Sequence, residues 1–150
     1  MPTYTCFAQQ GVISDEQKHR LAAGIAKVHS LATGAPIGFT QCVFEDLQPQ
    51  THYIGGVPAP EQGVWVYGHI RRGRTPEAKG RILQGICELL VDVLDAPKEA
   101  VWVYINELDN TDMIEFGRVL PVEGEEWPWV DKLPADLRDH MLALQKSLDQ

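Results

Sequence analysis

Basic residues are scarce in this 150-residue chain, in which 13 lysines and arginines stand against 21 aspartates and glutamates, for a formal net charge of −8. Nucleic acids are bound through basic surfaces, so this balance argues against nucleic acid as a general partner. The chain also lacks any apolar run near the roughly 18 residues of a membrane helix. No charged segment followed by an apolar stretch opens it, so we expect neither a membrane span nor a signal peptide.

Cysteines are few, and Cys6, Cys42 and Cys87 lie far apart among apolar residues. An odd, scattered set predicts reduced core thiols in a cytoplasmic protein rather than a disulfide framework. The sequence has no glycine-rich nucleotide loop, no Ser-His-Asp pattern and no Cys-x-x-Cys motif. Its five histidines have no metal-ligand spacing, so we expect no metal site.

Two similar halves align when the sequence is shifted by 61 residues, so that Ser14 falls on Thr75 and residues 40–44 fall on residues 101–105. Each half predicts a strand, a helix and a second strand. Ser14 is the predicted N-cap of the first helix, with Gln17 completing a capping box. Thr75 is the predicted N-cap of the second helix, and an Ala-Pro pair after each helix is expected to stop it.

Two β-α-β units predict an α/β (α+β) fold with a four-stranded, mainly parallel core sheet and two helices on one face. We expect a single domain over residues 1–150, with repeats at about 2–46 and 63–108 and a C-terminal extension. The uncovered sheet face is expected to carry Val66, Trp102 and Tyr104. An apolar face of that size predicts oligomerisation.

The irregular segments give weaker predictions. Residues 46–62 are rich in proline, glycine and glutamine and predict a linker with a short hairpin. Residues 114–120 predict one short strand, and residues 134–148 predict a terminal helix.

Pro2 begins a predicted strand, although proline cannot donate a hydrogen bond to a neighbouring strand. If Met1 is removed, Pro2 carries a secondary amine, and a free α-amino group titrates near pH 7.7–8.0 in the absence of perturbation, at about neutral pH. Such an amine can serve as an acid or a base. The alternative is structural, because proline is tolerated at the first position of a strand.

Arg71 and Arg74 lie between the end of a predicted strand and the start of the second helix. A helix start offers free N–H groups and partial positive charge, and two guanidiniums there suit a carboxylate or phosphate. The alternative is a pair of solvated loop arginines that contact surface acids such as Glu77.

Three further residues are candidates. His29 lies beside the apolar stripe of the first helix, and its alternative is a partly buried histidine with a local hydrogen bond. Glu115 is the acid in a short apolar strand, where burial would raise its pKa, and its alternative is an exposed edge residue. Tyr104 is either a core aromatic or a phenol that reaches into a site.

Together these features resemble the tautomerase superfamily, and within it the cis-3-chloroacrylic acid dehalogenase group. The resemblance covers nearly the whole chain, and Phe116 stands where that group usually has tyrosine. It rests on the opening Pro2-Thr3-Tyr4, His29, Arg71-x-x-Arg74, "VWVYINEL" with Tyr104, and "MIEFGRVLP" with Glu115.

The resemblance implies a homotrimer that acts on a small carboxylate without a cofactor. In this scheme Pro2 donates a proton, Arg71, Arg74 and His29 hold the carboxylate, and Glu115 activates water together with Tyr104 of a neighbouring subunit. The implied reaction is hydration of a cis-3-haloacrylate to malonate semialdehyde. The alternatives are a tautomerase or decarboxylase of small 2-oxo or 3-oxo acids, and a non-catalytic trimer that binds carboxylates.

Overall fold

A four-stranded sheet forms the centre of the protein in the computed structural model, which describes residues 2–148. Its strands run in the order β2-β1-β5-β6. The two outer pairs are parallel and the central pair, β1 with β5, is antiparallel, which agrees with the predicted mainly parallel sheet. The strands are β1 (Thr3–Gln9), β2 (Gln41–Leu47), β5 (Val64–Arg71) and β6 (Val101–Leu108).

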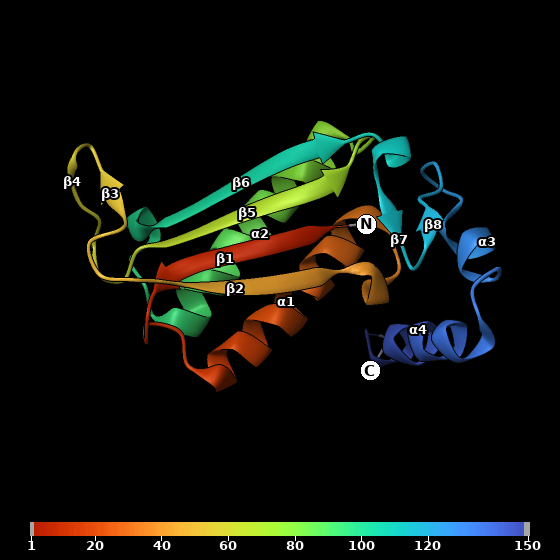
Figure 1. The fold of residues 1–150 in the computed structure, drawn as a ribbon, viewed down its shortest axis with the longest axis horizontal. Helices are drawn as coiled ribbons and strands as arrows, with labels where there is room; N and C mark the ends of the chain where they lie inside the picture. The colour runs from red at the N-terminus through yellow and green to blue at the C-terminus, as the bar shows by residue number, and fades with distance from the viewer. Residues whose placement is uncertain (1, 149–150) are drawn as a thin grey trace.

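Two long helices cover one face of this sheet, as predicted: α1 (Asp15–Thr33) and α2 (Pro76–Leu94) (Figure 1). The predicted capping box is present, since the backbone N–H of Gln17 donates to Ser14 Oγ at 3.2 Å and that of Ser14 donates to Gln17 Oε1 at 2.9 Å. Thr75 caps α2 by accepting from the backbone of Ala78 at 3.1 Å.

The prediction that the Ala-Pro pairs end both helices is wrong in detail. The helices end earlier, at left-handed residues that follow them: Gly34, with φ 73°, and Asp95, with φ 51°. Each following proline instead precedes a short 3-10 turn, at Ile37–Phe39 and Lys98–Ala100. A left-handed residue turns the chain out of the helix, and at Gly34 its backbone N–H donates to the Ser30 carbonyl at 2.8 Å, so proline is not needed to stop the helix.

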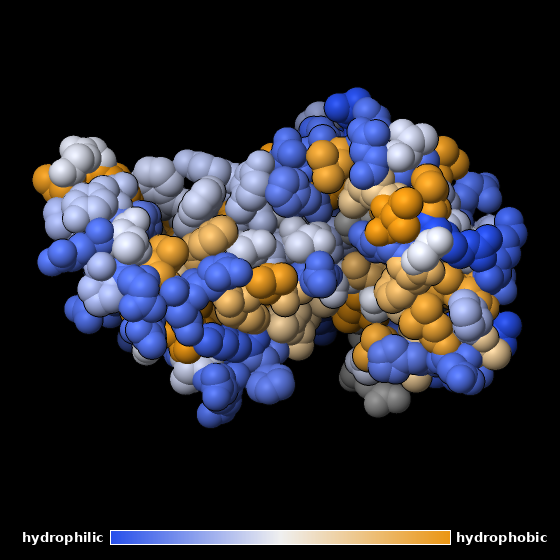
Figure 2. Space-filling model, viewed as in Figure 1, coloured by the Kyte–Doolittle hydropathy of each residue, from blue (hydrophilic) through white to orange (hydrophobic). Residues whose placement is uncertain are grey.

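The main core lies between the sheet and the two helices. Alternate residues of β1 and β5 point inward, and Tyr4, Cys6 and Val66 are among them. Val66 is fully buried there, so the prediction that it lies on the uncovered face is wrong. Successive residues of a strand point to opposite faces, and it is the neighbours of Val66, Trp65 and Tyr67, that lie on the uncovered face. The uncovered face carries aromatic rings and residues of intermediate hydropathy (Figure 2). Its aromatic residues include Phe7, Trp65, Tyr67, Trp102 and Tyr104.

Two short hairpins lie at opposite ends of the sheet (Figure 1). The expected hairpin within residues 46–62 is present as β3 (Tyr53–Ile54) and β4 (Val57–Pro58). The single strand predicted at 114–120 is instead a second hairpin, β7 (Ile114–Glu115) and β8 (Arg118–Val119). Phe116 and Gly117 both have positive φ, of 52° and 75°, and this pair forms the tight turn between the strands.

The C-terminal extension continues through α3 (Glu126–Val130) and α4 (Ala135–Leu148), close to the predicted terminal helix. It forms a second apolar cluster that joins the extension to the 3-10 turn before β2. The buried members of this cluster are Phe39, Leu120, Trp129, Val130, Leu133 and Met141. In the part of the chain that the structure describes, no helix combines the length and apolarity needed to cross a membrane.

The contact between α1 and α2 depends on glycine. A Cβ at Gly85 would lie 2.9 Å from Val28 Cγ1, whereas a Cβ at Gly80, in the same helix, would meet nothing within 4 Å. We expect Gly85→Ala to lower the free energy of unfolding by about 1–3 kcal/mol through overpacking. Gly80→Ala should raise it by about 0.5–1 kcal/mol, since alanine favours the helix.

Urea denaturation of both variants measures these changes. Equal effects of the two substitutions would contradict the role of Gly85 in helix packing.

Candidate active site

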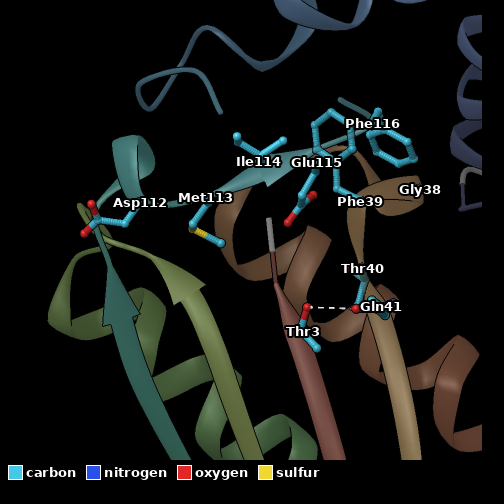
Figure 3. A pocket seen from close by; sticks show the side chains of 10 residues that line it. All are labelled: Thr3, Gly38, Phe39, Thr40, Gln41, Asp112, Met113, Ile114, Glu115 and Phe116. Atoms are coloured by element: carbon cyan, nitrogen blue, oxygen red, sulfur yellow. Dashed lines mark hydrogen bonds between the residues drawn. The ribbon is translucent and has the colours of Figure 1, made fainter. Parts of the chain in front are cut away.

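A cavity of about 550 Å³ opens at the end of the sheet where β1 begins (Figure 3). Pro2 is buried and immediately precedes Thr3, which lines the cavity. The Pro2 carbonyl accepts a hydrogen bond from the backbone N–H of Gln41 at 2.9 Å. The cavity lies between the starts of β1 and β2 and the β7 hairpin. Its lining residues are Thr3, Gly38, Phe39, Thr40, Gln41, Asp112, Met113, Ile114, Glu115 and Phe116.

The carboxylate of Glu115 points from β7 toward the start of β1 (Figure 3). Burial raises the pKa of Glu115 above its usual range. Glu115 is half-buried, which does not match the alternative of an exposed edge residue.

Arg71 and Arg74 are 5% and 8% exposed, so they are not solvated loop arginines. Arg71 ends β5, donates to the Pro121 carbonyl at 2.8 Å and forms a short ion pair with Glu126. Arg74 contacts Glu123 Oε1 at 2.7 Å and Glu126 Oε1 at 3.4 Å. Arg74 also donates to the Thr33 carbonyl of α1 at 3.4 Å, but the acidic partners of both arginines come from the C-terminal extension and not from Glu77.

His29 is buried near the C-terminal end of α1, and its Nδ1 shares a 2.8 Å hydrogen bond with the Tyr4 hydroxyl. Burial, with the positive charges of Arg74 and Arg71, lowers the pKa of His29 to about 3. Burial likewise raises the pKa of Tyr4. Both groups are thus neutral near pH 7, about 4 pH units above the pKa of His29.

Tyr104, like His29, Arg71 and Arg74, is not among the residues that line this cavity. It lies in the middle of β6 on the uncovered sheet face and is 46% exposed. Its ring contacts the rings of Trp65 and Trp102, with centroids 6.0 and 6.2 Å away.

Sequence reasoning missed Tyr4, Glu123 and Glu126. The alternation of β1 places Tyr4 on the inner face, and this signal was available from the pattern alone. Glu123 and Glu126 stand in an acidic run before a tryptophan, but nothing local shows which cations they face. No group of three or more metal-ligating side chains occurs within residues 2–148.

Residues 1–132 match a protein family described as "Putative oxalocrotonate tautomerase enzyme". The chain belongs to this tautomerase family. No curated protein is significantly similar to it.

Solved structures of tautomerase relatives share the fold. One is the crystal structure of N1, a member of the cis-3-chloroacrylic acid dehalogenase family. It is 34% identical, with a TM-score of 0.90, over 94% of this chain and 99% of that one. Another is a fused 4-OT described as an asymmetric trimer, 26% identical, with a TM-score of 0.72, over 78% of this chain and 94% of that one.

The buried state of His29 in this member of the tautomerase family predicts a pH dependence of stability. Its folded pKa of about 3 lies below the ordinary 6.5, so between these values the unfolded chain binds more protons than the folded chain. Stability from this group is therefore complete above pH 6.5 and is lost as the pH falls toward 3.

We expect the free energy of unfolding to fall more steeply over this range in the wild type than in His29→Gln. Urea titrations at a series of pH values measure the difference. Parallel curves for the two proteins would contradict it.

Proposed function

We propose that this member of the tautomerase family is a cofactor-independent hydratase of small unsaturated carboxylates, with cis-3-haloacrylate dehalogenase-like activity that depends on an amino-terminal proline. The proposal rests chiefly on Glu115, whose carboxylate points across the cavity toward the start of β1, where Pro2 is buried. The likeness to a member of the cis-3-chloroacrylic acid dehalogenase family supports it. The free cysteines fit a cytoplasmic location.

The carboxylate of the substrate is held by Arg71 and Arg74. Guanidiniums bind a carboxylate through paired, charge-assisted hydrogen bonds, and they draw electron density from the adjacent double bond. His29 remains neutral beside them. With the Tyr4 hydroxyl as donor to Nδ1, Nε2 carries the ring proton and donates to a substrate oxygen.

Water then adds across the double bond. Glu115 takes a proton from the water as its oxygen bonds to the β-carbon, and the protonated Pro2 amine gives a proton to the α-carbon. The halohydrin formed expels halide while its hydroxyl loses a proton. The products are malonate semialdehyde, halide and one proton, with no net oxidation or reduction.

Pro2 needs a free amine for this role. Met1 lies outside the described residues, so its removal is part of the proposal. The Glu115 carboxylate favours the protonated amine, whereas nearby guanidiniums oppose it. Glu123 and Glu126 offset the charge of those guanidiniums, which favours an acid at Pro2.

We further propose a homotrimer in which Tyr104 of one subunit completes the site of the next. The uncovered sheet face leaves the large side chains of Trp102 and Tyr104 exposed, which supports an interface there. The fused 4-OT neighbour that is described as a trimer supports this assembly.

Intact-mass spectrometry and halide release test the proline mechanism. We expect the mass of the chain without Met1, and release of chloride from cis-3-chloroacrylate. Pro2→Ala and Glu115→Gln should each lower kcat/KM by about a hundredfold or more, since each removes a positioned proton-transfer group.

Retained turnover in Pro2→Ala would exclude the proline mechanism. Ketonisation of phenylenolpyruvate without halide release would select a tautomerase instead, an outcome that the fused 4-OT neighbour makes a real alternative. Carboxylate binding without turnover of either compound would select the non-catalytic binding protein.

Mixed trimers test the contribution of Tyr104. Tyr104→Phe and Glu115→Gln are each expected to be inactive, but subunits of the two variants, unfolded together and refolded, should restore activity. Random mixing leaves about a quarter of the sites with both native side chains if the site spans two subunits. No recovery in a verified mixed trimer would show that Tyr104 acts within its own chain or not at all.

A further inference from the structure

Two carboxylates bind the buried arginine pair, and they differ in accessibility. The side chain of Glu126 is 10% exposed and that of Glu123 is 48% exposed. Glu123 lies in the turn before α3 and Glu126 is the first residue of that helix, so the arginine pair contacts one enclosed acid and one acid that is open to solvent.

Glu126 is held in place. One of its oxygens, Oε1, contacts the guanidiniums of both Arg71 and Arg74. Glu126 opens α3, and this helix is anchored by Trp129, whose indole N–H donates to the Val119 carbonyl at 2.9 Å. Release of Glu126 would leave two buried cations with one acid fewer, which is costly.

Glu123 contacts the arginine pair through one carboxylate oxygen and one guanidinium nitrogen. Its Oε1 lies 2.7 Å from Arg74 Nη1, and its Oε2 lies over Gly73, where a Cβ would come within 3.0 Å of it. The Glu123 carboxylate therefore packs against the backbone of Gly73, shortly before the start of α2, where no side chain stands in its way. The carboxylate can turn into water, but the buried Arg74 guanidinium would then lack an acid, so we expect Glu123 to leave only when another anion takes its place.

The charges at the site balance in this arrangement, since two arginines face two glutamates. If Glu123 leaves, one positive charge is uncompensated, and a singly charged ligand restores the balance. A doubly charged ligand would leave a net negative charge in a partly buried site, which is unfavourable. Arg71 Nε is also buried without a hydrogen-bond partner among the described residues.

We propose that Glu123 and Glu126 determine the ligand charge that this site accepts: a monocarboxylate displaces Glu123 from Arg74, while Glu126 remains and disfavours dicarboxylates. This inference rests on the proposed role of the arginine pair in carboxylate binding. Glu123 is then an internal competitor of the substrate, and Glu126 is a positioning and specificity-determining residue.

Binding of acrylate and maleate to the full chain tests the proposal, at mildly alkaline pH where maleate carries two charges. Calorimetry gives both dissociation constants for the wild type, Glu123→Gln, Glu126→Gln and the control Glu125→Gln. The control removes the same charge from an exposed neighbouring residue.

Glu123→Gln should bind acrylate about two- to fivefold more tightly than the control, since the internal competitor is lost. Glu126→Gln should shift the ratio of affinities toward maleate by about tenfold, because a fixed negative charge is removed. A purely structural role for Glu126 would weaken both ligands alike and leave the ratio unchanged. Glu123→Gln keeps the proposal testable if Glu126→Gln does not fold.

The inference is overturned if Glu123→Gln binds acrylate no more tightly than Glu125→Gln, or if a folded Glu126→Gln keeps the wild-type ratio. In either case normal binding of acrylate by the wild type would leave the proposed function standing. Failure of the wild type to bind acrylate would overturn the proposed function and this inference together.

Discussion

The antiparallel pairing of β1 with β5 at the centre of the sheet is the constraint on which the candidate site depends. Because Thr3 lies opposite His69, the start of the first strand meets the end of the strand that finishes at Arg71. The parallel partners extend this arrangement, since β2 begins and β6 ends at the same edge. With a parallel central pair, the amino terminus and the arginines would lie at opposite ends of the sheet.

Close packing supports this pairing. Gly68 lies opposite Tyr4, and a Cβ on Gly68 would come within 2.5 Å of the Tyr4 ring. The missing side chain therefore gives the ring room to turn inward and reach His29. Tyr4 and His29 form a neutral pair within electrostatic reach of Arg74. Because this pair adds no buried charge, Glu123 and Glu126 need to compensate only the two arginines.

The C-terminal extension completes the site from outside the repeat. It leaves the sheet after β6, supplies Glu115 through the β7 hairpin and returns with Glu123 and Glu126 over the arginines. The second apolar cluster holds it against the turn before β2. A duplicated β-α-β unit thus contributes the cations and the chain terminus, and the extension contributes the acids.

Local signals in the sequence determined the repeat, the strands and the two helix starts, because a cap such as Ser14 or Thr75 involves backbone groups only three residues away. They also singled out Pro2 and the arginines by position. The tertiary structure alone decided the sheet order, the turn at Phe116 and the acids that face the arginines. The contact of Arg71 with Glu126 joins residues 55 positions apart, and its existence follows from which strand ends meet, which no short-range pattern encodes.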